Sequence, residues 1–228
     1  MSTDVTTTTN PALPSLYETV DNRDRQLPSI YLLQGLSQAV QNGIGKSGEV
    51  IVGLGADDPE PTFLIGGDSG NDSFTAYILD RRRSYARFEQ GGQMDWMDKD
   101  EYDAARAAGD RDVWVNHHYT ILVPEVDETV PMRLMLSRTA GLKPSKALNF
   151  IVDRAVAMGQ LPVAKFSVGE ASSRTTGAKY SLFSVTSAEA TQEGLDAATN
   201  IQSFVAQGAQ RSREDAPVAL NSGDQPDI

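Results

Sequence analysis

Alternation of apolar and polar residues predicts that strands form most of this chain. Runs that alternate in this way, or that are rich in β-branched residues, cover residues 47–55, 61–67, 72–92, 111–126, 130–139 and 161–187. A period of two buries one face of a strand and exposes the other. The last run is typical of a hairpin, whereas residues 27–43 fit either a strand or a helix.

Three segments favour helices instead. Residues 143–159 place apolar side chains on one helical face after a candidate N-cap, Ser145, and this is the clearest helical pattern in the chain. An acidic helix is expected within residues 93–110, and a final helix near 188–207.

The order of these elements predicts the fold class and the domain organisation. We expect a mainly β fold with flanking helices: an OB-fold-like antiparallel barrel with a helix before its last two strands and an acidic helical insert. A mixed α+β sandwich is the main alternative. The predicted organisation is a disordered N-terminal arm over 1–27, an OB-like domain over 28–207 with its insert near 93–110 and a C-terminal helix near 188–207, and an acidic disordered tail over 208–228.

Charge is distributed unevenly along the chain. The protein has 228 residues and a net charge of −11, yet residues 131–181 contain eight basic residues against two acidic ones, and residues 81–90 contain four arginines against one glutamate. Because local potential decides nucleic-acid affinity, a negative total does not exclude it. The absence of cysteine excludes disulfides and favours an intracellular protein. Neither a secretory signal nor an apolar run of about 18 residues is present, so we expect no membrane association.

Catalytic chemistry is not expected. The only histidines, His117 and His118, are adjacent in a predicted strand, where neighbours point to opposite faces and cannot share one metal ion. Neither glycine-rich stretch, GLGADD or GGDSGND, continues as a phosphate-binding loop. The acidic residues within 95–103 lack the spacing of a calcium loop and suit a solvated helix face. We therefore expect no enzyme activity, no metal and no cofactor.

The segment LDRRRSYARFEQ, residues 79–90, combines arginines with aromatic rings. In a strand, Arg81, Arg83, Tyr85 and Arg87 share one face, and Tyr77 adds a further ring. Single-stranded nucleic acid is bound by cations that follow its phosphates and by rings that stack on its bases. We therefore predict a stacking surface here. An exposed edge strand whose charges prevent aggregation is the alternative.

A second basic region lies in the last predicted hairpin. Lys165 and Lys179 fall on its two strands, and Arg174 falls in its loop. In an OB-fold this loop contributes to the binding cleft, so we predict that these three residues also contact nucleic acid. Trp114 and Tyr119, in the predicted strand of residues 111–126, are further candidates for stacking. The core is the favoured alternative for each, because large rings usually fill cores.

Four stretches spread over residues 28–186 carry a resemblance to a known family. They are LPSIYLLQGLSQAV, GEVIVG, MRLMLSRTAGLKPSKALNFIVDRA and AKFSVGEASSRTTGAKYSLFSV. In these patterns the chain resembles bacteriophage single-stranded DNA-binding proteins. The resemblance implies an OB-fold that coats exposed DNA during replication and recombination, without strong sequence preference, in the cytoplasm of the infected bacterial host.

The family also implies partners. Its members bind single-stranded DNA and usually recruit replication or recombination proteins through an acidic tail, and a homo-oligomer is a further expectation. Residues 214–228 are only mildly acidic and end in Pro-Asp-Ile, without the terminal phenylalanine found in many bacterial relatives. Two other classes stay open: a phage structural or assembly protein that docks acidic partners on its basic segments, and an acidic DNA mimic, against which the clustered arginines argue.

Overall fold

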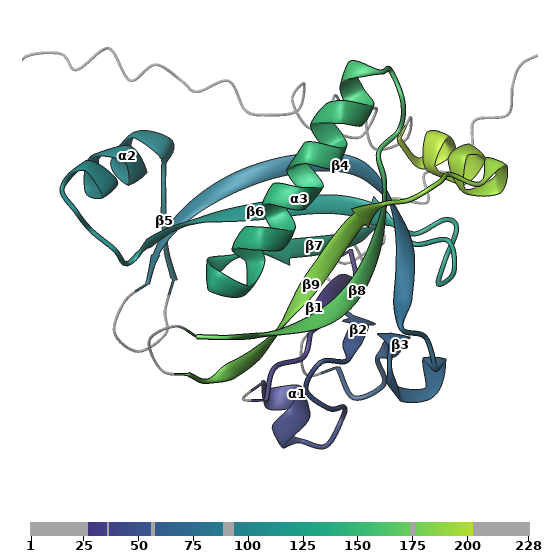
Figure 1. Ribbon diagram of the computed structural model, residues 1–228, viewed down its shortest axis with the longest axis horizontal. Coiled ribbons are helices and arrows are strands. Elements are labelled where there is room, and N and C mark those ends of the chain that lie inside the picture. The colour runs from purple at the N-terminus through teal and green to yellow at the C-terminus, as the bar shows by residue number, and fades with distance from the viewer. Residues whose placement is uncertain (1–26, 36, 56–57, 89–93, 174–176, 203–228) are drawn as a thin grey trace, which may run out of the picture.

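Within the described residues, nine strands form one curled sheet that dominates the molecule. The computed structural model describes residues 27–35, 37–55, 58–88, 94–173 and 177–202. The strands are β1 (Ser29–Leu32), β2 (Val50–Gly53), β3 (Thr62–Ile65), β4 (Ser73–Phe88), β5 (Met94–Met97), β6 (Val113–Leu122), β7 (Met132–Leu136), β8 (Val163–Ser172) and β9 (Lys179–Ser187). Their order is β3-β2-β1-β7-β6-β4-β8-β9, with β5 beside β4, and the sheet curls into a half-barrel (Figure 1). The predicted mainly β class is confirmed.

The sheet is mixed and its path is open. β1 runs parallel to β7, while the other paired strands of the described residues are antiparallel. The path ends at β3 and at β9. The side chain of Gln34, just after β1, reaches β9: its Nε2 donates to the Ser181 carbonyl at 2.8 Å, and its Oε1 accepts from the Ser181 N–H at 3.0 Å. The Gln34 amide therefore satisfies backbone groups of β9 that a further strand would otherwise pair.

The main core lies between the sheet and α3 (Arg138–Ala157), which crosses in front of the strands in Figure 1. Leu148 of this helix is fully buried together with Phe74 of β4 and Phe166 of β8. The two phenylalanine rings stack with their centroids 5.0 Å apart. The helical face predicted within 143–159 is therefore the face that covers the sheet.

The start of α3 differs from the prediction. Ser137, not Ser145, occupies the N-cap position. The Ser145 hydroxyl lies inside the helix and donates to the Leu142 carbonyl at 3.0 Å, which gives it a partner without ending the helix. A Cβ on Gly141 would lie 2.6 Å from the carbonyl carbon of Leu136, so glycine is needed where α3 turns back against the end of β7.

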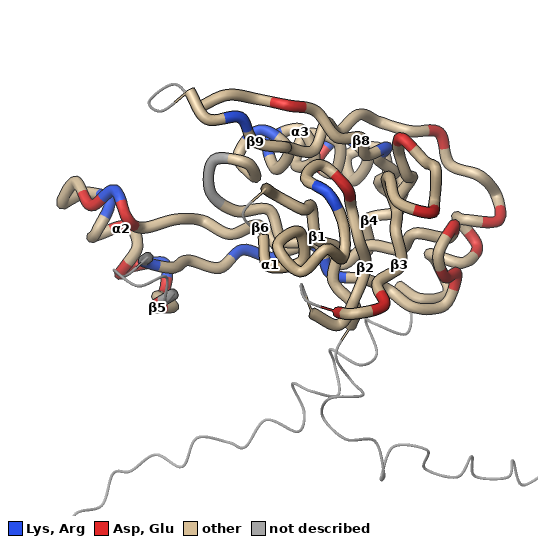
Figure 2. Tube along the Cα trace, turned by 90° about the horizontal axis from the view of Figure 1, so that it is seen from below, with Lys and Arg blue, Asp and Glu red and all other residues tan. Residues whose placement is uncertain are grey.

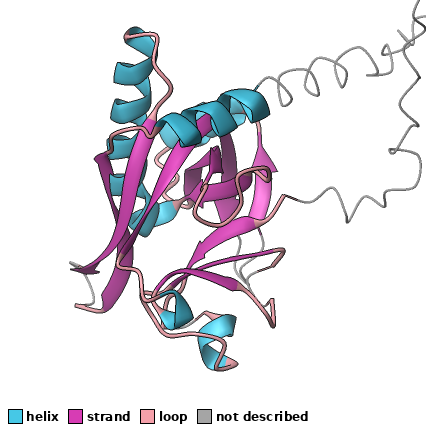
Figure 3. Ribbon diagram, turned by 90° about the vertical axis from the view of Figure 1, so that its right-hand side faces the viewer, coloured by secondary structure: helices cyan, strands magenta, loops and turns pink. Residues whose placement is uncertain are grey.

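One further helical segment packs on the other side of β4, and Figure 3 shows it across the upper end of the strands. Residues 192–202 are helical and pack on the face of β4 that points away from α3. Tyr77 is only 2% exposed there, and its hydroxyl accepts from the Thr191 N–H at 3.0 Å. A Cβ on Gly194 would lie 2.2 Å from the Tyr77 oxygen. Of the segment predicted near 188–207, residues 192–202 are helical and residues 188–191 are not, while the rest lies outside the described residues. The predicted N-terminal arm and acidic tail also lie outside the described residues, apart from residue 27.

Two short elements complete the fold. α1 (Gln38–Gln41) packs over β2, where Ala39 and Ile51 are both fully buried. A 3-10 turn, η1 (Gly67–Ser69), joins β3 to β4. Within the described part of the chain, no helix has both the length and the apolar character that a membrane crossing requires.

A bulge in β4 determines which side chains face α3. The register of β4 with β6 shifts between Ile78 and Asp80, so Leu79 is an extra residue in β4. Two strand residues four apart normally share a face. Here Tyr77 packs under the helical residues 192–202, whereas Arg81 pairs with Tyr119, which belongs to the core beneath α3. Beyond the bulge, β4 extends with β5 and β6 to the left of Figure 1, toward α2 (Lys99–Ala107).

Candidate nucleic-acid interface

The extended end of β4 presents four predicted site residues on one face. Arg81, Arg83, Tyr85 and Arg87 pair in register with Tyr119, His117, Val115 and Val113 of β6. Paired residues of antiparallel strands share a face, and Tyr119 marks this face as the one toward α3. The predicted common face of Arg81, Arg83, Tyr85 and Arg87 is therefore confirmed beyond the bulge. Tyr77, before the bulge, lies on the other face of the sheet.

Two of these arginines are engaged in ion pairs. Arg81 Nη1 lies 2.9 Å from Asp153 of α3, and Arg87 Nε lies 3.2 Å from Asp110. On the opposite face, Arg82 Nε lies 2.8 Å from Asp80. Arg83 makes no ion pair within the described residues and is exposed. Arg83 is therefore the arginine of β4 that is available to an external anion.

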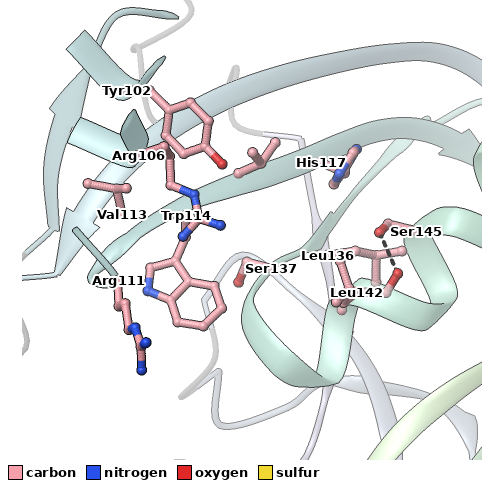
Figure 4. A pocket seen from close by; sticks show the side chains of 12 residues that line it. Tyr102, Arg106, Arg111, Val113, Trp114, His117, Leu136, Ser137, Leu142 and Ser145 are labelled. Atoms are coloured by element: carbon pink, nitrogen blue, oxygen red, sulfur yellow. Dashed lines mark hydrogen bonds between the residues drawn. The ribbon is translucent and has the colours of Figure 1, made fainter. Parts of the chain in front are cut away.

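Two adjoining cavities lie between α2, α3 and this face of the sheet, and together we name them the basic cleft. The smaller, of about 260 Å³, is lined by Tyr102, Arg106, Arg111, Val113, Trp114, Val115, His117, Leu136, Ser137, Gly141, Leu142 and Ser145. The larger, of about 380 Å³, is lined by Arg83, Tyr85, Lys99, Tyr102, Asp103, Val115, His117, Leu142, Ser145, Lys146 and Asn149. In Figure 4, Tyr102, Arg106 and Trp114 lie toward one side of the smaller cavity, and His117 and the α3 side chains lie toward the other.

Cations outnumber acids in the basic cleft. Its lining includes five basic side chains and one acidic side chain, Asp103, which pairs with Lys99. Four cations therefore have no acidic partner within the described residues: Arg83, Arg106, Arg111 and Lys146. In a chain of net charge −11 this is a marked local excess. Figure 2 shows many of the acidic positions at the end of the molecule that carries β2 and β3, away from α2.

The position of α2 depends on its own cap and on an aromatic contact. Asp98 accepts from the Glu101 N–H at 2.8 Å and Glu101 accepts from the Asp98 N–H at 2.9 Å, a capping box that fixes the start of the helix. Tyr102 then packs on Tyr85 of β4, with ring centroids 4.8 Å apart and planes inclined by 33°. Asp98 and Glu101 thus fix the start of the helix, while Lys99, Tyr102, Asp103 and Arg106 line the cleft.

His117 lies on the floor shared by the two cavities, and its neighbour His118 faces the other way. Burial lowers the pKa of the His117 imidazole, and the charges of Arg83 and Arg81 lower it further. Burial also lowers the pKa of His118, whose Nε2 lies 2.7 Å from the Ser84 hydroxyl on the opposite face. The predicted opposite orientation of the two histidines is confirmed. Within the described residues, no group of three or more His, Asp or Glu side chains is placed to hold a metal ion.

The two ring residues of β6 proposed from the sequence have different environments. Trp114 is partly buried and lines the smaller cavity. Tyr119 is 1% exposed, its hydroxyl donates to Asn149 Oδ1 at 2.9 Å, and burial raises its pKa to about 12. Trp114 is therefore open to a ligand, whereas Tyr119 is a core residue.

Other predicted site residues do not join the basic cleft. Tyr77 is buried under residues 192–202, so it offers no ring face to a base. Lys165 pairs with Thr75, before the bulge of β4, and is exposed there. Lys179 is exposed and lies 3.5 Å from Glu170, and Arg174 lies outside the described residues. Neither lysine is among the residues that line the cleft.

Sequence reasoning missed the part of the cleft that the helices contribute. α2 supplies Lys99, Tyr102 and Arg106, and α3 supplies Lys146. The spacing of the three α2 residues, three and then four positions apart, is the signal that they share one helical face. The many acidic residues between them concealed this signal.

Comparison with protein-family models, curated proteins and solved structures finds no match for this chain. The geometry and charge of the basic cleft are therefore the basis for a functional proposal.

Proposed function

We propose that this protein binds single-stranded DNA without catalysis and largely without sequence preference, with the basic cleft as its interface. The observation that carries the proposal is a cleft in an acidic protein that combines three aromatic side chains, Tyr85, Tyr102 and Trp114, with four cations that have no acidic partner among the described residues. Cations that follow phosphates, combined with rings that stack on bases, are the elements of sequence-tolerant strand binding. Duplex DNA holds its bases in the stack, so the rings favour an unpaired strand.

The fold and the biological setting form part of the same proposal. α3 directly precedes the final strand pair, β8 and β9, as the helix of an OB-like barrel is expected to do. The parallel β1–β7 pair is a departure from an antiparallel barrel. Together with the four sequence stretches described above, this arrangement supports membership of the phage single-stranded DNA-binding proteins, acting in replication or recombination inside the bacterial host.

Salt dependence tests the proposal directly. Each neutralised phosphate of a single strand contributes a slope of about −0.7 in log affinity against log salt, so four contacts give about −2.8. Raising the salt from about 50 mM to about 200 mM then weakens binding about fiftyfold. Fluorescence anisotropy of a labelled thymidine oligonucleotide, about 12 nucleotides long, measures this. If the protein fails to bind the oligonucleotide at the lower salt, the proposal is wrong.

A second candidate, a phage assembly protein, is favoured by one observation. α3 exposes large apolar side chains to solvent, with Phe150 68% and Val156 64% exposed. Such side chains are characteristic of surfaces that contact other proteins. This candidate predicts a defined oligomer or complex and no response to oligonucleotide, so capture from lysate with and without nuclease separates the two functions.

A further inference from the structure

The basic cleft has two cationic ends and an uncharged middle. Of the cations without acidic partners, Arg106 and Arg111 line only the smaller cavity, and Arg83 and Lys146 line only the larger one. The residues common to both cavities are Tyr102, Val115, His117, Leu142 and Ser145. A polyanion that engages all four of these cations must therefore pass over a middle made of a phenol ring, apolar side chains, a hydroxyl and an imidazole.

The imidazole in this middle is neutral. His117 Nδ1 is inaccessible to solvent and has no hydrogen-bond partner among the described residues. An imidazolium would place an N–H there with no acceptor, which is unfavourable for a buried donor. The neutral ring with its proton on Nε2 avoids this, because a buried nitrogen without a proton leaves no donor unpaired. Nε2–H is then the polar group that His117 offers to a ligand in the cleft.

The charged side chains around His117 also favour the neutral form of its imidazole. Arg83 lies directly across from it in the β4–β6 pairing, and Arg81 is two residues away on the same face. Tyr119 stacks near it, with ring centroids 6.5 Å apart. The other titratable or charged side chains that line the two cavities are Tyr85, Lys99, Tyr102, Asp103, Arg106, Arg111 and Lys146. Asp153 of α3 pairs with Arg81, and His118 is the neighbour of His117 in β6. Cations predominate in this set, so the electrostatic environment opposes a charged imidazole.

We propose that the middle of the basic cleft is a base-binding position, in which one unpaired nucleobase stacks on Tyr102 and accepts a hydrogen bond from His117 Nε2, while the phosphates on either side of that base lie at the two cationic ends. This inference rests on the proposed function. It adds which part of the DNA strand, base or phosphate, each region of the cleft recognises. A base has a flat face for the phenol ring and carbonyl or ring-nitrogen acceptors along its edge for a neutral donor. A phosphate in the middle would meet only neutral donors, whereas either end offers it two cations without acidic partners among the described residues.

Two probes of equal charge separate base binding from phosphate binding. One is a thymidine oligonucleotide of about 12 nucleotides, and the other is an abasic oligonucleotide of the same length, with the sugar-phosphate backbone and no bases. We expect the wild-type protein to bind the thymidine oligonucleotide about tenfold more tightly than the abasic one, since stacking strengthens binding for each base engaged. Equal affinity for the two would overturn the base-binding position and leave the proposed function standing. Failure to bind either oligonucleotide at low salt would instead count against the proposed function.

The two adjacent histidines provide a matched pair of variants. His117→Phe keeps a ring on the cleft floor and removes the donor, and His118→Phe makes the same change on the opposite face. We expect H117F to lose severalfold in affinity for the thymidine oligonucleotide and nothing for the abasic one, and H118F to bind both as the wild type does. Thermal melting checks that each variant folds. If both variants bind the two oligonucleotides as the wild type does, His117 is not a base contact.

Proton NMR of the wild-type protein avoids any folding effect of substitution. The chain contains two histidines, so the imidazole signals are few and can be assigned with the two variants. We expect the thymidine oligonucleotide to shift the His117 signals and leave those of His118 in place, with affinity constant between about pH 6.5 and pH 8 because the neutral ring takes up no proton. Affinity that rises steeply below that range and is lost in H117F would identify His117 as a charged phosphate contact, which would refute the proposal.

Discussion

Replacing Arg83 and Lys146 together by serine removes two of the four cations in the basic cleft that have no acidic partner within the described residues. Both side chains are exposed and neither makes a hydrogen bond or ion pair that is observed in the described part of the chain, so the fold should tolerate the change. Arg81 and Arg87 are less suitable, because their ion pairs hold the sheet to α3 and to Asp110.

The size of the effect follows from counterion release. Two lost phosphate contacts reduce the slope of log affinity against log salt from about −2.8 to about −1.4. If other contacts are unchanged, the double variant binds a single strand about 60-fold more weakly at about 50 mM salt, and about tenfold more weakly at about 200 mM. The informative quantity is the ratio of the affinity loss at the lower salt to the affinity loss at the higher salt. A general loss of folded protein would weaken binding by the same factor at both salt concentrations.

Fluorescence anisotropy with a thymidine oligonucleotide measures both affinities. The matched control replaces Lys165 and Lys179 by serine, which makes the same change in net charge at exposed lysines outside the cleft. The control should keep the wild-type slope. An unchanged slope in the cleft variant, or an equal decrease in the two variants, would show that the strand responds to overall charge and that the basic cleft is not its interface.

Three further predictions concern stability. Gly194→Ala places a methyl group on the Tyr77 ring and should destabilise the fold by about 1–3 kcal/mol, measured by urea unfolding, with loss of protection in residues 192–202 by hydrogen exchange. Gln34→Ala leaves two backbone groups of β9 unpaired and should cost about 1–3 kcal/mol, and an unchanged urea midpoint would show that water replaces the amide. Burial lowers the pKa of His117 and His118 below the unfolded value, so the unfolded state binds protons first as pH falls. The free energy of unfolding should therefore decrease below about pH 6.5, and replacing both histidines by glutamine should reduce that decrease.

Local alternation predicted where the strands lie but not how they pair. The runs at 72–92, 111–126 and 161–187 contain β4, β6, and the pair β8 and β9, because a half-buried strand imposes a period of two on its own residues. The parallel contact of β1 with β7 joins segments about a hundred residues apart, and no local pattern records it. The bulge at Leu79 was equally invisible, since it inserts one residue without breaking the apolar run, and it is the reason that Tyr77 and Arg81 face opposite ways.

The candidate site was predictable only where it follows the period of one strand. Arg81, Arg83, Tyr85 and Arg87 share the predicted face because β4 is regular beyond its bulge. The residues that turn this face into a cleft come from α2 and α3, whose positions depend on tertiary contacts such as the packing of Tyr102 on Tyr85. The prediction that the last hairpin belongs to the interface relied on the geometry of an OB barrel. The residue pattern alone did not place Lys165 and Lys179 at the interface.

An acidic protein with a cleft in which cations outnumber acids should bind a short strand at that one position. The acidic side chains over the rest of the surface repel phosphates, and at physiological salt charges interact over about 8 Å, so the cations of the cleft do not offset that repulsion elsewhere. An oligonucleotide of about 6 nucleotides should therefore saturate at one per chain at physiological salt. Isothermal titration calorimetry gives this ratio. Several strands per chain would mean that Arg82, Arg133 or the lysines of the last hairpin form an independent site, and the confinement of binding to the basic cleft would then be wrong.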